Sequence, residues 1–222
     1  MSDWCQHKPY AAYLFDLDGT LIDTAPDIME ALNHALATDN LGPVSEELTR
    51  HWIGHGGRAM IKQALLAAER NADDAAVDDL LEPFMDFYHE HCAERSAPYP
   101  AVLATLDALK GMGAALAVVT NKATRFTGAV LEGLNMSHYF DAVVCGDTTD
   151  HPKPHRAPVD HCLAQLDATA DRALFVGDSE TDVGAAKAAG VRVVCMRDGY
   201  NHGIDVATLK PDGVIDTFAE LL

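Results

Sequence analysis

The chain has few basic residues. Its 222 residues include 16 Lys and Arg against 34 Asp and Glu, which gives a formal charge of −18. Binding to the phosphate backbone of DNA or RNA depends on clustered Lys and Arg, so we expect no nucleic-acid partner. The same deficit disfavours an anionic membrane surface. A small anionic substrate is compatible with this composition if a cation and local hydrogen-bond donors offset the negative field.

The chain also lacks paired cysteines and long apolar runs. Its five cysteines are scattered and form no Cys-x-x-Cys pair. Free thiols of this kind are typical of a reducing compartment. No stretch is long and apolar enough to span a bilayer, and no basic segment followed by an apolar one opens the chain. The expectation is a cytoplasmic protein with no membrane association.

What is present is the composition of a globular protein, 48% hydrophobic and 23% charged. From residue 98 onward, apolar runs alternate with helical patterns. The expected strands are 115–120, 142–145, 173–178, 192–196 and 213–215, and the expected helices are 101–112, 124–135, 157–167, 181–189 and a terminal one. This alternation predicts an α/β, doubly wound parallel-sheet (Rossmann-like) core with right-handed crossovers. The β-prone run 10–15 has the apolar character of a buried strand of the same sheet.

Residues 24–96 contain no convincing strand. A hydroxyl at Thr24 and an early proline at Pro26 predict a helix start, and the turn residues 40–43 predict its end. Further helical patterns cover 57–69 and 75–93. We therefore predict an all-helical cap domain over residues 23–96, inserted into an α/β catalytic core made of residues 1–22 and 97–222.

Polar clusters follow the expected strands directly. Asp16 and Asp18 lie two positions apart after the first strand, where like charges held close together are explained by a cation or proton between them. Similar clusters occupy 120–122, 153–154 and 177–182. Because the carboxyl ends of parallel strands meet at one edge of the sheet, we expect these clusters to converge there.

The residue types in these clusters suit phosphoryl transfer. Acidic side chains favour Mg²⁺, which also keeps water and substrate oxygens as ligands. A lysine and a hydroxyl suit the oxygens of a phosphoryl group. One carboxylate can act as a nucleophile that forms an aspartyl-phosphate, and a second can donate and accept the proton. The clusters therefore predict a Mg²⁺-dependent enzyme of phosphate esters.

The four runs 15–21, 120–122, 153–154 and 177–182 resemble, in order, the four motifs of the haloacid dehalogenase superfamily. The resemblance implies that Asp16 is the nucleophile and a Mg²⁺ ligand. It implies that Asp18 is the general acid and base, and binds the metal through its backbone carbonyl. Asp178 would complete the metal site. Dehalogenating members lack the second acidic residue, so the presence of Asp18 favours phosphate chemistry.

The resemblance also assigns the remaining polar residues. Thr120, aided by Asn121, would bind the phosphoryl oxygens, and Lys153 would neutralise charge on the nucleophile and the phosphoryl group. Asp182 would support the metal site without binding the metal directly. Two simpler interpretations stay open: Thr120 could be the N-cap of the helix that follows, and Asp182 could cap a helix or face solvent in its first turn.

Three stretches, 23–27, 52–58 and 199–203, resemble the bacterial phosphoglycolate phosphatases within that superfamily. In the glycine-rich stretch, Gly56 would let the backbone approach a very small substrate. We hypothesise that Arg58 pairs with a substrate carboxylate in bidentate fashion. Two residues depart from the subfamily pattern, His55 in place of a common Asn and Arg156 in place of a usual Pro.

These features predict a Mg²⁺-dependent phosphomonoester hydrolase acting on a small phosphorylated metabolite, with 2-phosphoglycolate as the expected substrate. The chain would act as a monomer or homodimer. One alternative is a phosphatase of another small ester such as a sugar phosphate, or a phosphosugar mutase. A more remote alternative is a non-catalytic binding or regulatory module on the same fold, which the intact acidic residues and Lys153 argue against.

Overall fold

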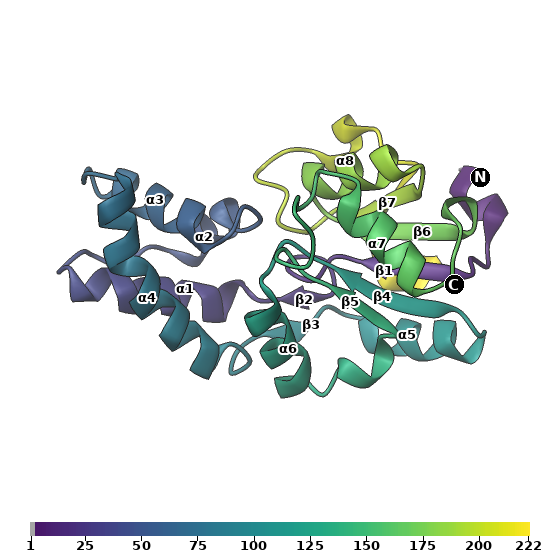
Figure 1. The fold of residues 1–222 in the computed structure, drawn as a ribbon, viewed down its shortest axis with the longest axis horizontal. Helices are drawn as coiled ribbons and strands as arrows, with labels where there is room; N and C mark the ends of the chain where they lie inside the picture. Colours follow the sequence, from purple (N-terminus) through teal and green to yellow (C-terminus); the bar gives the residue numbers. More distant parts are fainter. Residues whose placement is uncertain (1–2) are drawn as a thin grey trace.

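A computed structural model describes residues 3–222, and its centre is a parallel sheet (Figure 1). Within these residues the sheet has six strands in the order β5-β4-β1-β6-β7-β8. The strands are β1 (Ala12–Phe15), β4 (Ala115–Val119), β5 (Ala142–Val144), β6 (Ala173–Gly177), β7 (Arg192–Met196) and β8 (Gly213–Ile215). Their nearly continuous burial is typical of a sheet that is covered on both faces. The predicted α/β doubly wound core is confirmed.

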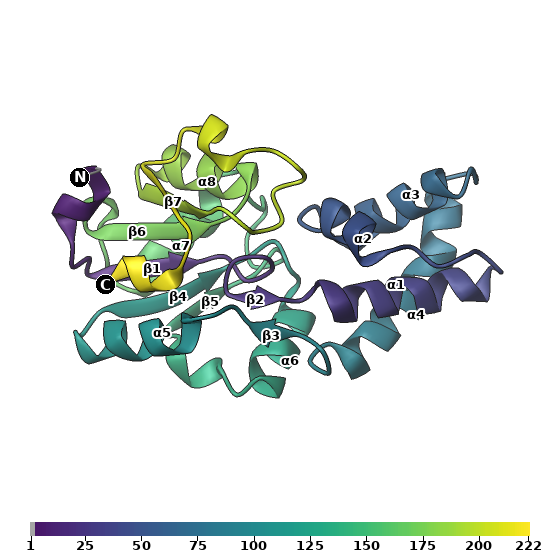
Figure 2. The same ribbon diagram turned by 180° about the vertical axis from the view of Figure 1, so that it is seen from behind.

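Helices cover both faces of this sheet (Figures 1 and 2). Alternate residues of β1 enter two separate hydrophobic cores, because successive side chains of a strand point to opposite faces. Tyr13 and Phe15 share one core with α5 (Val102–Gly111) and α6 (Thr124–Gly133). The opposite face packs on α7 (Ala157–Gln165) and α8 (Glu180–Ala189). This two-sided packing holds the strand ends in register, so that residues following them are fixed in space.

Four further helices lie beside the sheet and form what we call the helical group, α1–α4 (Figure 1). They are α1 (Ala25–Thr38), α2 (Glu46–Trp52), α3 (Gly57–Ala67) and α4 (Asp74–His91). Helix α2 was not predicted, because it has seven residues and only Thr49 among them is buried, which leaves no apolar stripe to detect. Thr24 is the N-cap of α1, but its hydroxyl donates to Asp18 instead of capping the helix.

A short antiparallel pair joins the helical group to the sheet. In it, β2 (Ile22–Asp23) pairs with β3 (Ala97–Pro98), so the outgoing and returning chains lie side by side. Two-residue strands are too short to show a period in sequence, and neither was predicted. The pair lies where we predicted the boundaries of the cap.

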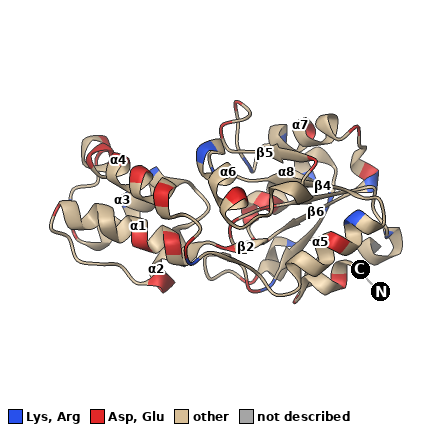
Figure 3. Cartoon of the chain, turned by 90° about the horizontal axis from the view of Figure 1, so that it is seen from below, with Lys and Arg blue, Asp and Glu red and all other residues tan. Residues whose placement is uncertain are grey.

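The remaining elements are short 3₁₀ helices. They are η1 (Asp3–His7), η2 (Ser137–Tyr139), η3 (Ala170–Arg172), η4 (Val206–Leu209) and η5 (Phe218–Leu221). The predicted terminal helix is thus a single 3₁₀ turn. Figure 3 shows acidic residues on the helical group as well as around the sheet, in keeping with the negative charge. None of the helices formed by residues 3–222 has the length and apolar character needed to cross a membrane.

Candidate active site

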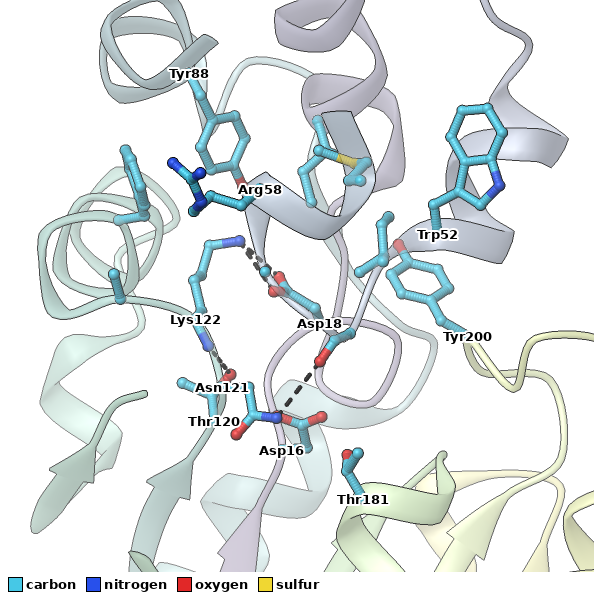
Figure 4. A pocket seen from close by; sticks show the side chains of 18 of the residues that line it. Asp16, Asp18, Trp52, Arg58, Tyr88, Thr120, Asn121, Lys122, Thr181 and Tyr200 are labelled. Carbon is cyan, nitrogen blue, oxygen red and sulfur yellow. Dashed lines mark hydrogen bonds and ion pairs between the residues drawn. The ribbon is translucent and has the colours of Figure 1, made fainter. Parts of the chain in front are cut away.

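The site lies at the carboxyl edge of the sheet, where three adjacent strands end. Asp16 directly follows β1, Thr120 follows β4 and Asp178 follows β6. Strands β4, β1 and β6 are neighbours, and Lys153 lies in the loop that follows β5. The predicted convergence is therefore observed, and Figure 4 shows Asp16 and Thr120 close together at the base of a pocket.

Lys153 is the central cation of the site. Its ammonium lies 2.8 Å from Asp16 Oδ1, 2.7 Å from Asp182 Oδ1 and 2.8 Å from the backbone carbonyl oxygen of Val119. These contacts use the three N–H donors of the ammonium. Burial works to lower the pKa of Lys153, but the two carboxylates outweigh it and the pKa is raised. The side chain therefore carries a positive charge against Asp16 at all physiological pH values.

Asp182 supports Lys153 from the first turn of α8. Its Oδ2 accepts hydrogen bonds from the backbone N–H groups of Asp178 and Ser179 and from the Ser179 hydroxyl. It thus closes a capping box with Ser179 while its other oxygen accepts from Lys153. Asp182 therefore caps the helix, which was one of the two interpretations left open by the sequence. The other is wrong, because the side chain is fully buried and does not face solvent. The helix cap and the lysine contact share one carboxylate.

Asp178 is held by groups from two distant segments. Its Oδ1 accepts from the Thr20 hydroxyl at 2.7 Å, and its Oδ2 accepts from the backbone N–H of Tyr200. Both segments approach closely through glycine. A Cβ on Gly19, where φ is +82°, would lie 2.5 Å from Asp178 Oδ2, and a Cβ on Gly199 would lie 2.1 Å from Asp178 Cβ. These positions require glycine because no side chain fits there.

The carboxylates of Asp16, Asp178 and Asp182 form an acidic cluster whose oxygens lie within 4.8 Å of one another. Burial raises the pKa of Asp16 to about 7, although the positive charge of Lys153 works to lower it. Burial, then the charges of Asp182 and Asp16, raises the pKa of Asp178. Such a buried excess of negative charge fits a hard divalent cation with oxygen ligands. Asp16 and Asp178 line the pocket and Asp182 does not, so Asp16 and Asp178 are the side chains that could hold a cation there.

Asp18 is connected to a second lysine that sequence reasoning missed. Lys122 Nζ lies 2.9 and 3.0 Å from the two carboxylate oxygens of Asp18, and the Thr24 hydroxyl donates to Oδ1 at 2.7 Å. The Lys122 side chain is 6% exposed and its ammonium lies 4.8 Å from the centre of the Tyr88 ring. The carboxylate of Asp18 thus points to Lys122 and away from the acidic cluster. The feature of the sequence that could have indicated a role for Lys122 was its position in the 120–122 motif.

Thr120 and Asn121 have different local tasks. Thr120 is buried, lines the pocket, and its hydroxyl accepts a hydrogen bond from the Lys122 backbone N–H at 3.2 Å. Helix α6 begins at Thr124 with Ala123 as N-cap, so Thr120 is not the cap of this helix. Asn121 lines the pocket, yet its amide bonds to the backbone N–H and C=O of Lys153 at 2.9 and 3.0 Å. Asn121 therefore fixes the loop that carries Lys153.

The pocket is a cavity of about 280 Å³ between the sheet edge and the helical group. Its core side is lined by the predicted residues Asp16, Asp18, Thr120, Asn121, Lys153 and Asp178, with Lys122. Its other side includes Trp52, Ile53, Gly54, Gly56, Arg58, Phe84 and Tyr88. A cavity of this size can hold a small-molecule ligand.

The predicted residues of the helical group are at the rim of this pocket. Gly56 has a φ of +86°, which favours glycine, and it is the N-cap of α3. The guanidinium of Arg58 pairs with Asp78 and lies 3.6 Å from Asp74, and its side chain is 48% exposed. His55 and Arg156 are not among the pocket-lining residues: His55 packs near the ring of His202, and Arg156 pairs with Asp160.

Comparison with known proteins agrees with this geometry. Residues 13–196 match the family model described as haloacid dehalogenase-like hydrolase. The chain belongs to this family.

Comparison with individual proteins indicates which kind of hydrolase within this family the chain resembles. The chain is 41% identical to a phosphoglycolate phosphatase of Mesorhizobium japonicum, over 94% of this chain and 91% of that protein. It is 39% identical to one of Agrobacterium fabrum, over 94% and 89% of the two chains. A crystal structure of a predicted phosphoglycolate phosphatase from Haemophilus somnus superposes with a TM-score of 0.89 at 36% identity, covering 96% of each chain. The prediction of a phosphatase of this superfamily is confirmed.

Proposed function

We propose that this chain hydrolyses 2-phosphoglycolate to glycolate and phosphate, with Mg²⁺ and through an aspartyl-phosphate on Asp16. The observation that carries the proposal is the lysine-bridged carboxylate pair: Lys153 Nζ contacts both Asp16 and Asp182 at 2.8 and 2.7 Å, next to Asp178. The names of the similar proteins support the substrate.

In the first step, an oxygen of the Asp16 carboxylate attacks phosphorus. The bond between phosphorus and the ester oxygen breaks, and the departing oxygen takes a proton from the carboxyl group of Asp18. Asp16 suits the role of nucleophile because its side chain lines the pocket while Lys153 fixes one of its oxygens. Lys153 also offsets the negative charge that two anions bring together. Thr120, at the base of the pocket, would contact the phosphoryl oxygens.

In the second step, Asp18, now a carboxylate, takes a proton from water. The resulting hydroxide attacks phosphorus, the bond between phosphorus and the Asp16 oxygen breaks, and phosphate leaves with Asp16 restored. Lys122 and Thr24 hold the Asp18 carboxylate at distances of 2.7 to 3.0 Å. We infer that these contacts keep Asp18 available to the same oxygen position in both steps.

Mg²⁺ would be held by Asp16 and Asp178, with the backbone carbonyl of Asp18 as a further ligand, and would supply positive charge beside the phosphoryl oxygens. Asp182 would act indirectly, because it fixes Lys153 and the N-terminus of α8. Thr20 and the backbone of Tyr200 orient Asp178.

We propose that the helical group, within residues 23–96, acts as a cap over a catalytic core formed by residues 1–22 and 97–222. The cavity lies between the two, and the β2–β3 pair joins them. In this proposal Gly56 allows close approach to the substrate, and Arg58 contributes positive charge at the rim. The cavity, of about 280 Å³, has room for a two-carbon phosphate ester.

Phosphate release from 2-phosphoglycolate, measured with and without Mg²⁺, tests the function. Asp16→Asn keeps the shape of the side chain but removes the nucleophile, so kcat should fall by a factor on the order of 10⁴ or more. Asp160→Asn, an exposed carboxylate on α7, is the matched control and should retain full activity. Retained turnover in Asp16→Asn would refute the covalent mechanism. A preference for sugar phosphates, or a requirement for a bisphosphate activator, would refute the assigned substrate.

A further inference from the structure

A buried hydroxyl that lines the pocket has no hydrogen-bond partner among the described residues. Among residues 3–222, the buried side-chain oxygens and nitrogens without a hydrogen bond are the hydroxyls of Tyr88 and Tyr99. Of these two residues, only Tyr88 lines the pocket. A buried hydroxyl without a partner is unfavourable, because its hydrogen bonds to water are lost and no hydrogen bond within the protein replaces them. Such an atom at a binding pocket points to a ligand that supplies the missing hydrogen bond.

The ring of Tyr88 is held firmly by residues from both sides of the pocket. Phe84, one turn earlier on α4, stacks with it at 5.9 Å, and Phe126 of α6 packs at 5.3 Å. The ammonium of Lys122 lies 4.8 Å from the ring centre, a cation–π contact. The ring is 2% exposed. Its hydroxyl is therefore positioned before any ligand arrives.

The hydroxyl lies on the side of the pocket away from the nucleophile. In Figure 4 the labelled residues run from Asp16 at the base through Asp18 to Lys122, with Tyr88 and Arg58 above. A phosphoryl group bound at Asp16 places its ester oxygen at Asp18, so the remainder of the substrate extends toward Lys122 and Tyr88. The part of the substrate that reaches Tyr88 is the part that distinguishes one phosphate ester from another.

The chemistry at this end suits an anionic oxygen. Burial, followed by the negative charge of Asp18, raises the pKa of Tyr88 well above its usual value, so the hydroxyl stays protonated and can donate. Lys122 provides a buried ammonium beside it, which contacts both carboxylate oxygens of Asp18 and has a third N–H donor. A hydrogen-bond donor next to a cation binds a carboxylate well, because hydrogen bonds to an ionised acceptor are strong.

We propose that Tyr88 is a specificity-determining residue whose hydroxyl, together with the ammonium of Lys122, binds the carboxylate of the substrate. This assignment rests on the proposed function and deepens it, because it places recognition of the acid group at the contact between α4 and α6. It adds a binding group to the helical side of the pocket that is buried, in contrast to the exposed Arg58.

The test compares Tyr88→Phe with Tyr99→Phe, which removes the other unpartnered hydroxyl from a residue that does not line the pocket. Each variant is assayed with 2-phosphoglycolate and with ethyl phosphate, which has the same carbon chain and no carboxylate. For Tyr88→Phe we expect kcat/KM on 2-phosphoglycolate to fall about 10- to 100-fold, the effect of one hydrogen bond to a charged group. Activity on ethyl phosphate should change by less than about 3-fold. Tyr99→Phe should leave both unchanged.

Binding gives a second readout that does not depend on turnover. Calorimetry with 3-phosphonopropionate and with propylphosphonate, in the presence of Mg²⁺, measures the preference for the carboxylate in wild type and in Tyr88→Phe. Loss of that preference in the variant supports the proposal. An equal loss on both substrates, or no change in either readout, overturns it. A wild-type protein that does not hydrolyse 2-phosphoglycolate refutes the proposed function instead, and the binding comparison then still decides the role of Tyr88.

Discussion

The two sides of the pocket are built in opposite ways. On the core side, Asp16, Lys153, Asp178 and Asp182 are all less than 10% exposed, and each side chain is held by several partners. On the rim of the helical side, Arg58 is about half exposed and pairs with carboxylates of its own surface. The core side concentrates buried charge, and the helical side offers mostly apolar and glycine surface.

This difference has a physical cause. A buried charge without a partner is strongly unfavourable, so every group of the core side must be fixed by another, and the whole set is rigid. An exposed ion pair contributes little to stability, so residues at the rim can change at small cost. The core side is therefore suited to a reaction common to many substrates, and the helical side to the choice among them.

Among the changes that test this comparison, Lys153→Met is expected to have the largest effect. The variant leaves Asp16 and Asp182 buried without their cation, so the free energy of unfolding should fall by about 3–5 kcal/mol at pH 8. Because the charge beside the nucleophile is also lost, kcat should fall at least about 100-fold. Denaturant unfolding and phosphate release measure the two effects.

Lys62→Met is the matched control for that variant, since Lys62 is an exposed lysine on α3. It should change neither stability nor turnover. If Lys153→Met were as stable as Lys62→Met, the core side would not depend on mutual charge compensation, and the comparison between the two sides would be wrong.

A smaller effect is expected from removal of Mg²⁺, and it should depend on pH. The pKa of Asp16 is raised from 3.8 to about 7 in the folded protein without metal, so the folded state binds the proton more tightly than the unfolded state. The stability that this group contributes is fully present below about pH 3.8 and is lost as the pH rises to about 7. Mg²⁺ bound as proposed would compensate the ionised carboxylates, so the increase in Tm that it causes should be larger near pH 8 than near pH 5.5.

Saturating Mg²⁺, at about 100 times its Kd, stabilises by about 2.7 kcal/mol, which corresponds to a rise in Tm of about 5–10 °C for a chain of this size. Scanning fluorimetry with chelator or Mg²⁺ at the two pH values measures it. Asp178→Asn should abolish the rise, because it removes one of the two proposed carboxylate ligands. A larger rise at pH 5.5 would contradict the assigned role of the acidic cluster.

The smallest effect is expected from Arg58→Ala. If Arg58 contributes to binding the substrate carboxylate from the rim, KM for 2-phosphoglycolate should rise by up to about 10-fold while kcat and Tm stay unchanged. Asp78→Asn removes the partner that now holds the guanidinium and should lower KM or leave it unchanged. Unchanged kinetics in Arg58→Ala would show that this arginine has no part in substrate binding.

Long elements and chemical motifs were accessible from the sequence. The strands 173–177 and 192–196 and the helices near 101–112 and 180–189 show clear patterns, because burial selects apolar residues at fixed spacing. Helix α2 and the β2–β3 pair were missed because they are too short to show a period. The hydroxyl of Thr24 was expected to cap α1, but Asp18, six residues earlier, is its actual acceptor.

The sequence alone determined the alternation of strands and helices in the core and the choice of Asp16, Asp18, Lys153 and Asp178 as candidate site residues, because these depend on local pattern and on residue chemistry. The tertiary structure decided which groups pair. It placed Lys153 between Asp16 and Asp182, turned Lys122 to Asp18, and brought the Tyr88 hydroxyl from α4 over the pocket. Such pairings join residues that are 29 to 137 positions apart. Nothing in a local pattern encodes them, since they follow from the packing of the helical group and the sheet against each other.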